Sequence, residues 1–156
     1  MSNLLKIRFP ENTPPESIVR WEKAMREMLS GYHEDPGLDV QFPAEGAGLI
    51  ISRGITFSSV CEHHLLPFFG VAEIKYVPSD KIVGLSKLAR TVGVYSRRLQ
   101  LQERLTGQIA QAIQDALNPV GVSVTLKGTH TCQGCRGVRQ QAEMITTKTI
   151  GNNEGK

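Results

Sequence analysis

The chain has 156 residues and a formal net charge of +3 at neutral pH; 40% of its residues are hydrophobic and 21% are charged. These values are typical of one globular domain, and they exclude a chain that is disordered along most of its length. The charge is not collected in a run of lysines and arginines, and no apolar run approaches the ~20 residues of a membrane helix, so neither nucleic acid nor a membrane is an expected partner.

The first third of the chain changes from a helical to a β pattern. Two prolines followed by a glutamate mark the start of an amphipathic helix predicted over about 14–30. Residues 33–48 are rich in glycine, proline and acidic residues and predict a loop. A β-rich segment over 49–58 follows, in which Gly54 suggests a bulge. Residues 69–77 then alternate with a period of two, which predicts a second strand.

Two helices and two further strands complete the prediction. Residues 86–97 and 101–117 have helical spacing, and the second of these segments carries a clear apolar stripe. Residues 120–127 alternate as a strand does, and a last strand is predicted over about 140–149. Strands paired as hairpins, with two helices between them, predict an α+β fold: an antiparallel four-stranded sheet with two central helices on one face and an N-terminal helix.

We predict a single domain over 1–150, with its catalytic core over about 49–150. Residues 151–156 contain no apolar side chain, and we predict a flexible tail there. A four-stranded sheet with an open edge also favours association of several copies into a larger sheet or barrel.

A Cys-x-x-His turn connects the first two predicted strands. Its Cys61 and His64 are of the types that bind zinc, and they can supply two ligands of a tetrahedral site. The other cysteines, Cys132 and Cys135, have Cys-x-x-Cys spacing. Three protein ligands leave a position for water, as in catalytic sites, whereas four close the site and make it structural. Spacing alone leaves both interpretations open, beside that of merely buried cysteines.

A second histidine accompanies each half of this site. His63 adjoins His64, and His130 lies two residues before Cys132. If the strand continues through 132, His130 and Cys132 lie on the same side of it. A structural zinc site has no use for additional imidazoles, whereas hydrolysis of a ring needs groups that exchange protons near neutral pH. The two histidines together favour a catalytic site.

Polar side chains at the helix starts suggest a bound anion. Ser86, Lys87 and Arg90 can share one face at a helix N-terminus, an arrangement suited to a phosphate chain. Glu103 can accept N–H groups from a guanine edge, and Arg136 follows Cys132 closely enough to reach the same phosphates. The alternatives are an exposed basic face, an ordinary first-turn acid and an exposed loop arginine.

These motifs together resemble the GTP cyclohydrolase I family over residues 55–150. The resemblance rests on long segments in the right order: Cys61-Glu-His-His64, Gly84-Leu-Ser-Lys-Leu-Ala-Arg90, residues 95–106, His130-Thr-Cys132 and Arg136-Gly137. It implies the tunnelling fold, in which the sheets of neighbouring subunits close into a barrel, and a homo-oligomer, typically a decamer, with active sites at subunit interfaces. It also implies conversion of GTP and water to formate and 7,8-dihydroneopterin triphosphate, the first step of a folate, pterin or deazapurine pathway.

The resemblance further implies roles for individual residues. Zinc would be held by Cys61, His64 and Cys132, and His63 and His130 would be the acid and base groups. The implied substrate contacts are Gln102 and Glu103 to guanine, and Ser86, Lys87, Arg90 and Arg136 to the triphosphate or ribose. The N-terminal helix is similar only in outline, which leaves further phosphate contacts from Arg20 and Lys23 open.

Three other functions share some of these features. A related tunnelling-fold enzyme would take GTP or a pterin to another product. A zinc module that binds nucleic acid would need a basic stripe interleaved with aromatic residues, which the sequence lacks. A nitrile reductase would need a catalytic cysteine without a metal. The odd number of cysteines and the absence of a secretory signal pattern predict a cytoplasmic protein.

Overall fold

The computed structural model describes residues 9–152. Its elements, in chain order, are α1 (Pro15–Met28), the 3₁₀ helix η1 (Ser30–His33), β1 (Gln41–Pro43), β2 (Ile50–Cys61), β3 (Pro67–Val77), β4 (Lys81–Val83), α2 (Leu85–Ser96), β5 (Leu99–Gln100), α3 (Gln102–Leu117), β6 (Gly121–His130), α4 (Thr131–Gly134) and β7 (Glu143–Gly151). Each helix and strand expected from the sequence is present. The last strand extends to Gly151, a residue that the prediction assigns to the tail, and residues 153–156 lie outside the described part.

The main sheet has five strands in the order β5-β2-β3-β6-β7, not the four that were predicted. The additional strand is β5, which pairs in parallel with the end of β2 through Val60↔Leu99 and Cys61↔Gln100. A strand of two residues is too short to show a period, so no sequence pattern could indicate it. The other neighbours are antiparallel as expected. The predicted loop over 33–48 contains β1, which pairs with β4 in a separate two-stranded sheet.

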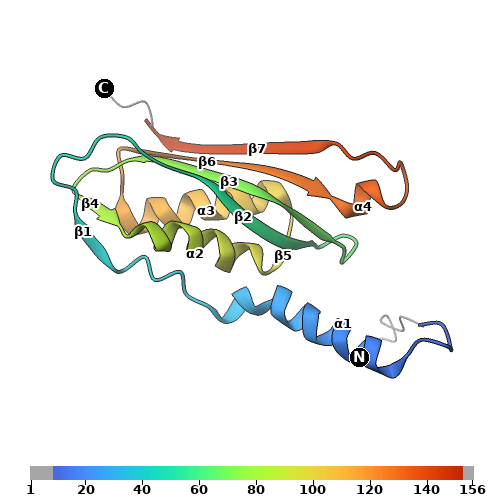
Figure 1. The fold of residues 1–156 in the computed structure, drawn as a ribbon. Helices are drawn as coiled ribbons and strands as arrows, with labels where there is room; N and C mark the ends of the chain where they lie inside the picture. Colours follow the sequence, from blue (N-terminus) through green and yellow to red (C-terminus); the bar gives the residue numbers. More distant parts are fainter. Residues whose placement is uncertain (1–8, 153–156) are drawn as a thin grey trace.

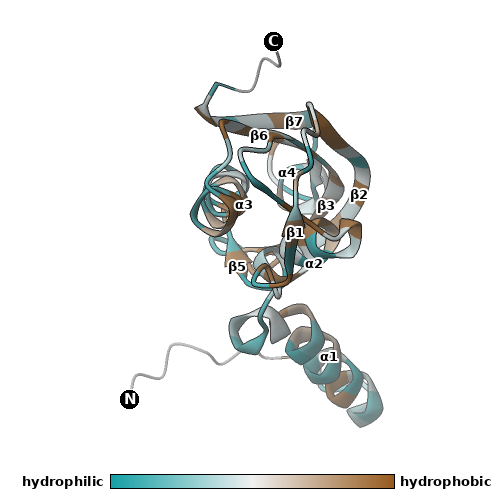
Figure 2. Cartoon of the chain, turned by 90° about the vertical axis from the view of Figure 1, so that its left-hand side faces the viewer, coloured by the Kyte–Doolittle hydropathy of each residue, from teal (hydrophilic) through white to brown (hydrophobic). Residues whose placement is uncertain are grey.

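The core lies between the sheet and the two central helices. Figure 2 shows the sheet curving over α2 and α3. Alternate residues of β3 and β6 face these helices, so that Ala72, Ile74 and Tyr76 are at most 1% exposed, as the alternation predicted. Leu88 of α2 and Ile109 of α3 are fully buried against them. Each large apolar side chain buried in this way contributes about 1.5–3 kcal/mol to stability.

A bulge in β2 lies at Gly54, as the sequence indicated. The register with β3 shifts between Arg53 and Ile55, and Gly54 has a φ of +75°. An L-residue adopts that left-handed conformation only at a cost, whereas glycine adopts it freely. The bulge increases the local twist of the sheet and so contributes to its curvature.

The N-terminal helix α1 extends from the rest of the domain, contacts β2 and η1, and has no buried residue. The chain rejoins the domain at η1, where the Gly31 amide donates to the Arg97 carbonyl at 2.9 Å. A Cβ at Gly31 would lie 2.0 Å from the Val94 carbonyl oxygen, so only glycine allows this close approach to α2. Among residues 9–152, no helix has both the length and the apolar character needed to cross a membrane.

Candidate metal centre and active site

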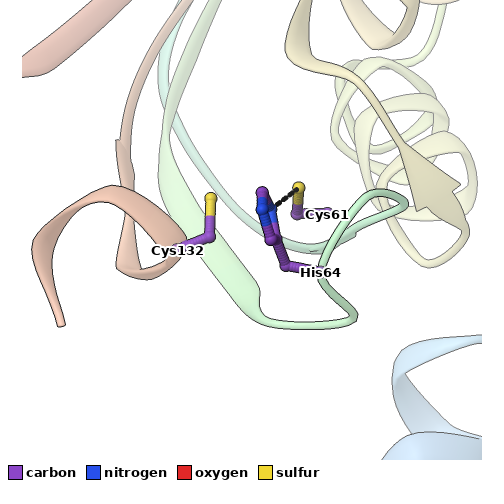
Figure 3. Close-up of side chains that lie close together, drawn as sticks. All are labelled: Cys61, His64 and Cys132. Atoms are coloured by element: carbon purple, nitrogen blue, oxygen red, sulfur yellow. Dashed lines mark hydrogen bonds between the residues drawn. The ribbon is translucent and has the colours of Figure 1, made fainter. Parts of the chain in front are cut away.

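The end of β2 and the turn after it bring together the first two predicted ligands. The backbone folds back tightly there, with the Leu65 amide donating to the Cys61 carbonyl at 2.8 Å and Leu65 at a φ of +54°. The Cys61 amide donates to the Leu66 carbonyl at 2.9 Å, which closes the hairpin into β3. As a result the His64 Nδ1 lies 3.7 Å from the Cys61 Sγ (Figure 3).

The third predicted ligand comes from the end of β6. The strand stops at His130, and Cys132 lies in the short helix α4. The expectation that His130 and Cys132 share one side of a continuous strand is therefore wrong. The Thr131 hydroxyl donates to the Pro67 carbonyl at 2.6 Å, which fixes α4 to the start of β3. This contact holds Cys132 facing the other two ligands (Figure 3).

These three side chains form a group that fits a zinc ion. One ligand atom from each of Cys61, His64 and Cys132 lies within 4.8 Å of the others. Zinc–sulfur bonds of about 2.3 Å and zinc–nitrogen bonds of about 2.0 Å in a tetrahedron place ligand atoms roughly 3.5–3.8 Å apart, which the 3.7 Å separation of the Cys61 and His64 atoms matches. Cys135 is exposed and lies outside the group. The geometry thus supplies three protein ligands and leaves a fourth position for water.

The environment of Cys132 favours its neutral thiol until a cation binds. Burial raises the pKa of this thiol, the neighbouring Cys61 raises it further, and the guanidinium of Arg136 opposes both. A bound metal reverses this preference because it coordinates the thiolate. Arg136 therefore lies at the metal end of the domain, and it is exposed there.

The two additional histidines lie at the same end and differ in their environment. His63 is exposed, and its ring centroid lies 6.1 Å from that of His64. His130 is partly buried and stacks on Phe68, with centroids 4.3 Å apart and an interplanar angle of 7°. Burial lowers the pKa of His130, and the nearby Glu103 carboxylate opposes that shift. A neutral imidazole near pH 7 suits a group that accepts or returns a proton.

The two residues predicted to contact guanine have different positions. Glu103 is exposed in the first turn of α3 and lies near His130, so its carboxylate is available to a ligand. Gln102 is only 1% exposed, and its side chain bonds to the sheet and to His130. The Gln102 side chain thus forms its hydrogen bonds with the sheet and His130 in this structure, and the guanine contact predicted for it stays a prediction.

The predicted phosphate contacts lie at the opposite end of the domain. Ser86, Lys87 and Arg90 are in the first half of α2, which begins beside β4, whereas the metal group lies where β2 and β6 end (Figure 1). From Ser86 to Ser96 alone the helix spans about 15 Å. The Lys87 ammonium lies against the loop at Gly37, where a Cβ would approach it to 2.7 Å. One chain does not bring these residues to its own metal group.

Sequence reasoning missed the support of the ligand turn. Arg104 of α3 forms an ion pair with Glu62, donates to the Leu99 carbonyl at 3.0 Å and donates to the Gln100 side chain at 3.1 Å. The hydrogen bond from Arg104 lowers the pKa of Glu62. The Glu62 amide also donates to the Gln100 carbonyl at 3.1 Å. The only signal in the sequence was an acidic residue inside the Cys-x-x-His motif.

The arrangement of the sheet, the helices and the cysteine/histidine group defines a fold class. It is an α+β domain with a curled mixed sheet and a cysteine/histidine group where the strands end. The crystal structure of the archaeosine synthase QueF-Like in the apo form has the same fold, with a TM-score of 0.53 over 65% of this chain and 94% of that one. At 20% sequence identity this likeness shows the fold alone. This likeness supports the predicted fold class, an α+β protein of the tunnelling fold.

The family follows from the sequence comparisons. The model of the GTP cyclohydrolase I family matches residues 12–155. The chain is 48% identical over 139 residues to "GTP cyclohydrolase 1" of Chlorobium chlorochromatii, covering 87% of this chain and 61% of the relative. Relatives of the same name from Leptospira biflexa and Methylococcus capsulatus are each 47% identical, over 85% and 90% of this chain and 74% and 80% of their own lengths. The chain belongs to the GTP cyclohydrolase I family, which confirms the resemblance and its class as a hydrolase.

Proposed function

We propose that this protein hydrolyses GTP to formate and 7,8-dihydroneopterin triphosphate with the help of zinc. Membership of the family carries the proposal, and the group formed by Cys61, His64 and Cys132 supports it, because it has the donors and spacing of a zinc site with an open position. Its product would enter a folate, pterin or deazapurine pathway. We place the protein in the cytoplasm, where its free cysteines remain reduced.

Zinc would be held by the two thiolates and the His64 imidazole. When bound, the ion supplies Lewis acidity that makes a water nucleophilic near neutral pH. The Glu62–Arg104 pair and the Thr131–Pro67 hydrogen bond hold the two ligand segments in place from either side. These outer contacts orient the ligands before any metal arrives.

The protein's own groups would bind guanine and move its protons. The Glu103 carboxylate would accept hydrogen bonds from the N–H groups of the guanine edge, a pairing that distinguishes guanine from adenine. His130 would take a proton from the attacking water and return it to N7 as the five-membered ring opens and formate leaves. The exposed His63 would exchange protons in the later opening of the ribose and closure of the pterin ring.

The phosphates would be bound by a neighbouring copy. Ser86, Lys87 and Arg90 lie at the far end of the same chain, so a complete site needs the metal end of one subunit beside the α2 start of another. Arg136 would add a cation from the metal end. We therefore propose a homo-oligomer, a decamer by analogy with the family, with active sites at subunit interfaces. Contacts from Arg20 and Lys23 of α1 belong to the same proposal.

The proposal is tested by incubating the purified, zinc-loaded protein with GTP. We expect one formate per GTP and a fluorescent pterin after oxidation, and both should disappear when a chelator removes the metal. His130→Ala should keep its zinc and release no formate, whereas Cys132→Ser should lose the zinc as well. Absence of formate at every metal loading would refute the proposal, and normal turnover by His130→Ala would refute the role of that histidine.

A further inference from the structure

The orientation of one buried amide is determined by its neighbours. The Nε2 of Gln102 lies 2.9 Å from the Met144 carbonyl oxygen and 3.2 Å from that of Leu126. Carbonyl oxygens only accept, so the atom facing them must be the donating nitrogen of the amide. The Thr146 hydroxyl, 3.2 Å away, is a third partner of the same nitrogen. The amide oxygen is consequently fixed on the other side, where it can only accept.

This oxygen determines which nitrogen of His130 carries a proton. The Gln102 Oε1 lies 2.9 Å from the His130 Nε2. An acceptor at this distance requires a hydrogen on Nε2, and the neutral imidazole has only one N–H. The lone pair of neutral His130 is therefore on Nδ1, for which residues 9–152 supply no hydrogen-bond partner. Stacking on Phe68 fixes the plane of the ring in the same position.

We propose that Gln102 is a positioning residue, which holds His130 as the Nε2–H tautomer and leaves Nδ1 as the atom that exchanges a proton with the substrate. The catalytic consequence rests on the function proposed above, whereas the tautomer does not. His130 also lines a cavity of about 390 Å³ together with Phe69 and Cys135. An imidazole in the other tautomer would turn a lone pair towards the amide oxygen and lose this hydrogen bond.

A glycine makes room for the amide. A Cβ at Gly128, two residues before His130 on β6, would lie 2.5 Å from the Gln102 Oε1 and 3.3 Å from its amide carbon. The next atom, on the ring of Phe57, would be at an ordinary 3.6 Å. Gly128→Ala therefore displaces the end of the Gln102 side chain and leaves His130 and the metal ligands unchanged in sequence. The residue also has no positive φ, so alanine is compatible with the backbone.

The test compares three variants of the zinc-loaded protein. Gln102→Leu removes the amide, and Gly128→Ala displaces it. Thr149→Val is the matched control: it removes the hydroxyl contact between Thr149 of β7 and Ser123 of β6, the two strands that also contact the Gln102 amide, at a point away from Gln102. Ring ¹⁵N chemical shifts report the tautomer, and His130→Asn assigns the His130 signals among the four histidines. Zinc content and the steady-state constants for GTP are measured on each protein.

The wild type and Thr149→Val should show the Nε2–H tautomer. Gln102→Leu and Gly128→Ala should show a mixture of tautomers, full zinc content, and kcat reduced about 10- to 100-fold with KM changed less than about threefold, since proton transfer by a positioned side chain contributes a factor of this order or more. Should Gln102→Leu fail to fold, Gly128→Ala carries the test by itself.

An Nδ1–H tautomer in the wild type would overturn the proposal, and so would unchanged tautomer and kcat in Gly128→Ala and Gln102→Leu. A rise in KM with unchanged kcat would also overturn it, because that result would assign Gln102 to substrate binding. If the wild type releases no formate from GTP, the proposed function fails, yet the ¹⁵N shifts still decide whether Gln102 sets the tautomer.

Discussion

Mixing two inactive variants tests whether each active site is shared between chains. One variant, His130→Ala, is defective at the metal end, and the other, Lys87→Ala combined with Arg90→Ala, is defective at the start of α2. The α2 helix has 12 residues and separates these ends by more than about 15 Å. In any one active site, the metal end and the α2 start therefore come from different subunits. Each variant alone should retain less than about 1% of the wild-type turnover.

Co-expression of the two variants in equal amounts should restore activity. In randomly mixed oligomers, half of the metal ends and half of the neighbouring α2 starts are intact, so about one quarter of the sites are complete. Formate release per subunit should therefore reach about 25% of the wild-type rate. Differently tagged subunits, copurified on both tags, show that mixing took place. Copurified oligomers no more active than the variants alone would refute the shared site, because a site within one chain would never be repaired.

Three further predictions concern the support of the site and the core. Arg104→Met should weaken zinc binding about tenfold in a chelator competition, because the contact that holds Glu62 and the ligand turn is lost, and unchanged affinity would contradict that role. Cys135→Ser should leave zinc content and turnover unchanged, and a loss of zinc would restore the four-ligand interpretation. Burial raises the pKa of Tyr76, so the unfolded chain releases that proton first and the free energy of unfolding should fall as pH rises above about 10. In urea titrations Tyr76→Phe should lose less stability over that range, and an identical decline in both proteins would be evidence against this cause.

The local patterns of the sequence determined most of the architecture. Alternation in the segment containing Ile74 and Tyr76 predicted which side chains are buried, because a strand turns successive residues to opposite faces whatever it packs against. Helical spacing located α1, α2 and α3 for the same reason. Gly54 was identified as a bulge because its requirement is set by the backbone at that residue.

The tertiary structure decided whatever depends on residues that are distant in sequence. Cys132 lies near Cys61 because β2 and β6 both run antiparallel to β3 and therefore end at the same edge of the sheet. Spacing within a motif carries no information on this strand order. The parallel strand β5 could not be predicted because two residues are too few to show a period. The family resemblance implies a guanine contact for Gln102, and only the tertiary structure shows that its side chain is buried against three backbone and side-chain partners from β6 and β7.

Some features of the candidate site follow from the sequence, and others follow only from the fold. The residue types predicted the kind of chemistry, metal binding by cysteine and histidine beside groups that exchange protons, because those properties belong to the side chains themselves. Only the fold placed Ser86, Lys87 and Arg90 at the far end of α2 from the metal group, because a rigid helix keeps its two ends apart. The sequence by itself thus determined which residue types are candidates for the site, and the tertiary structure decided that these candidates lie at two ends of one chain.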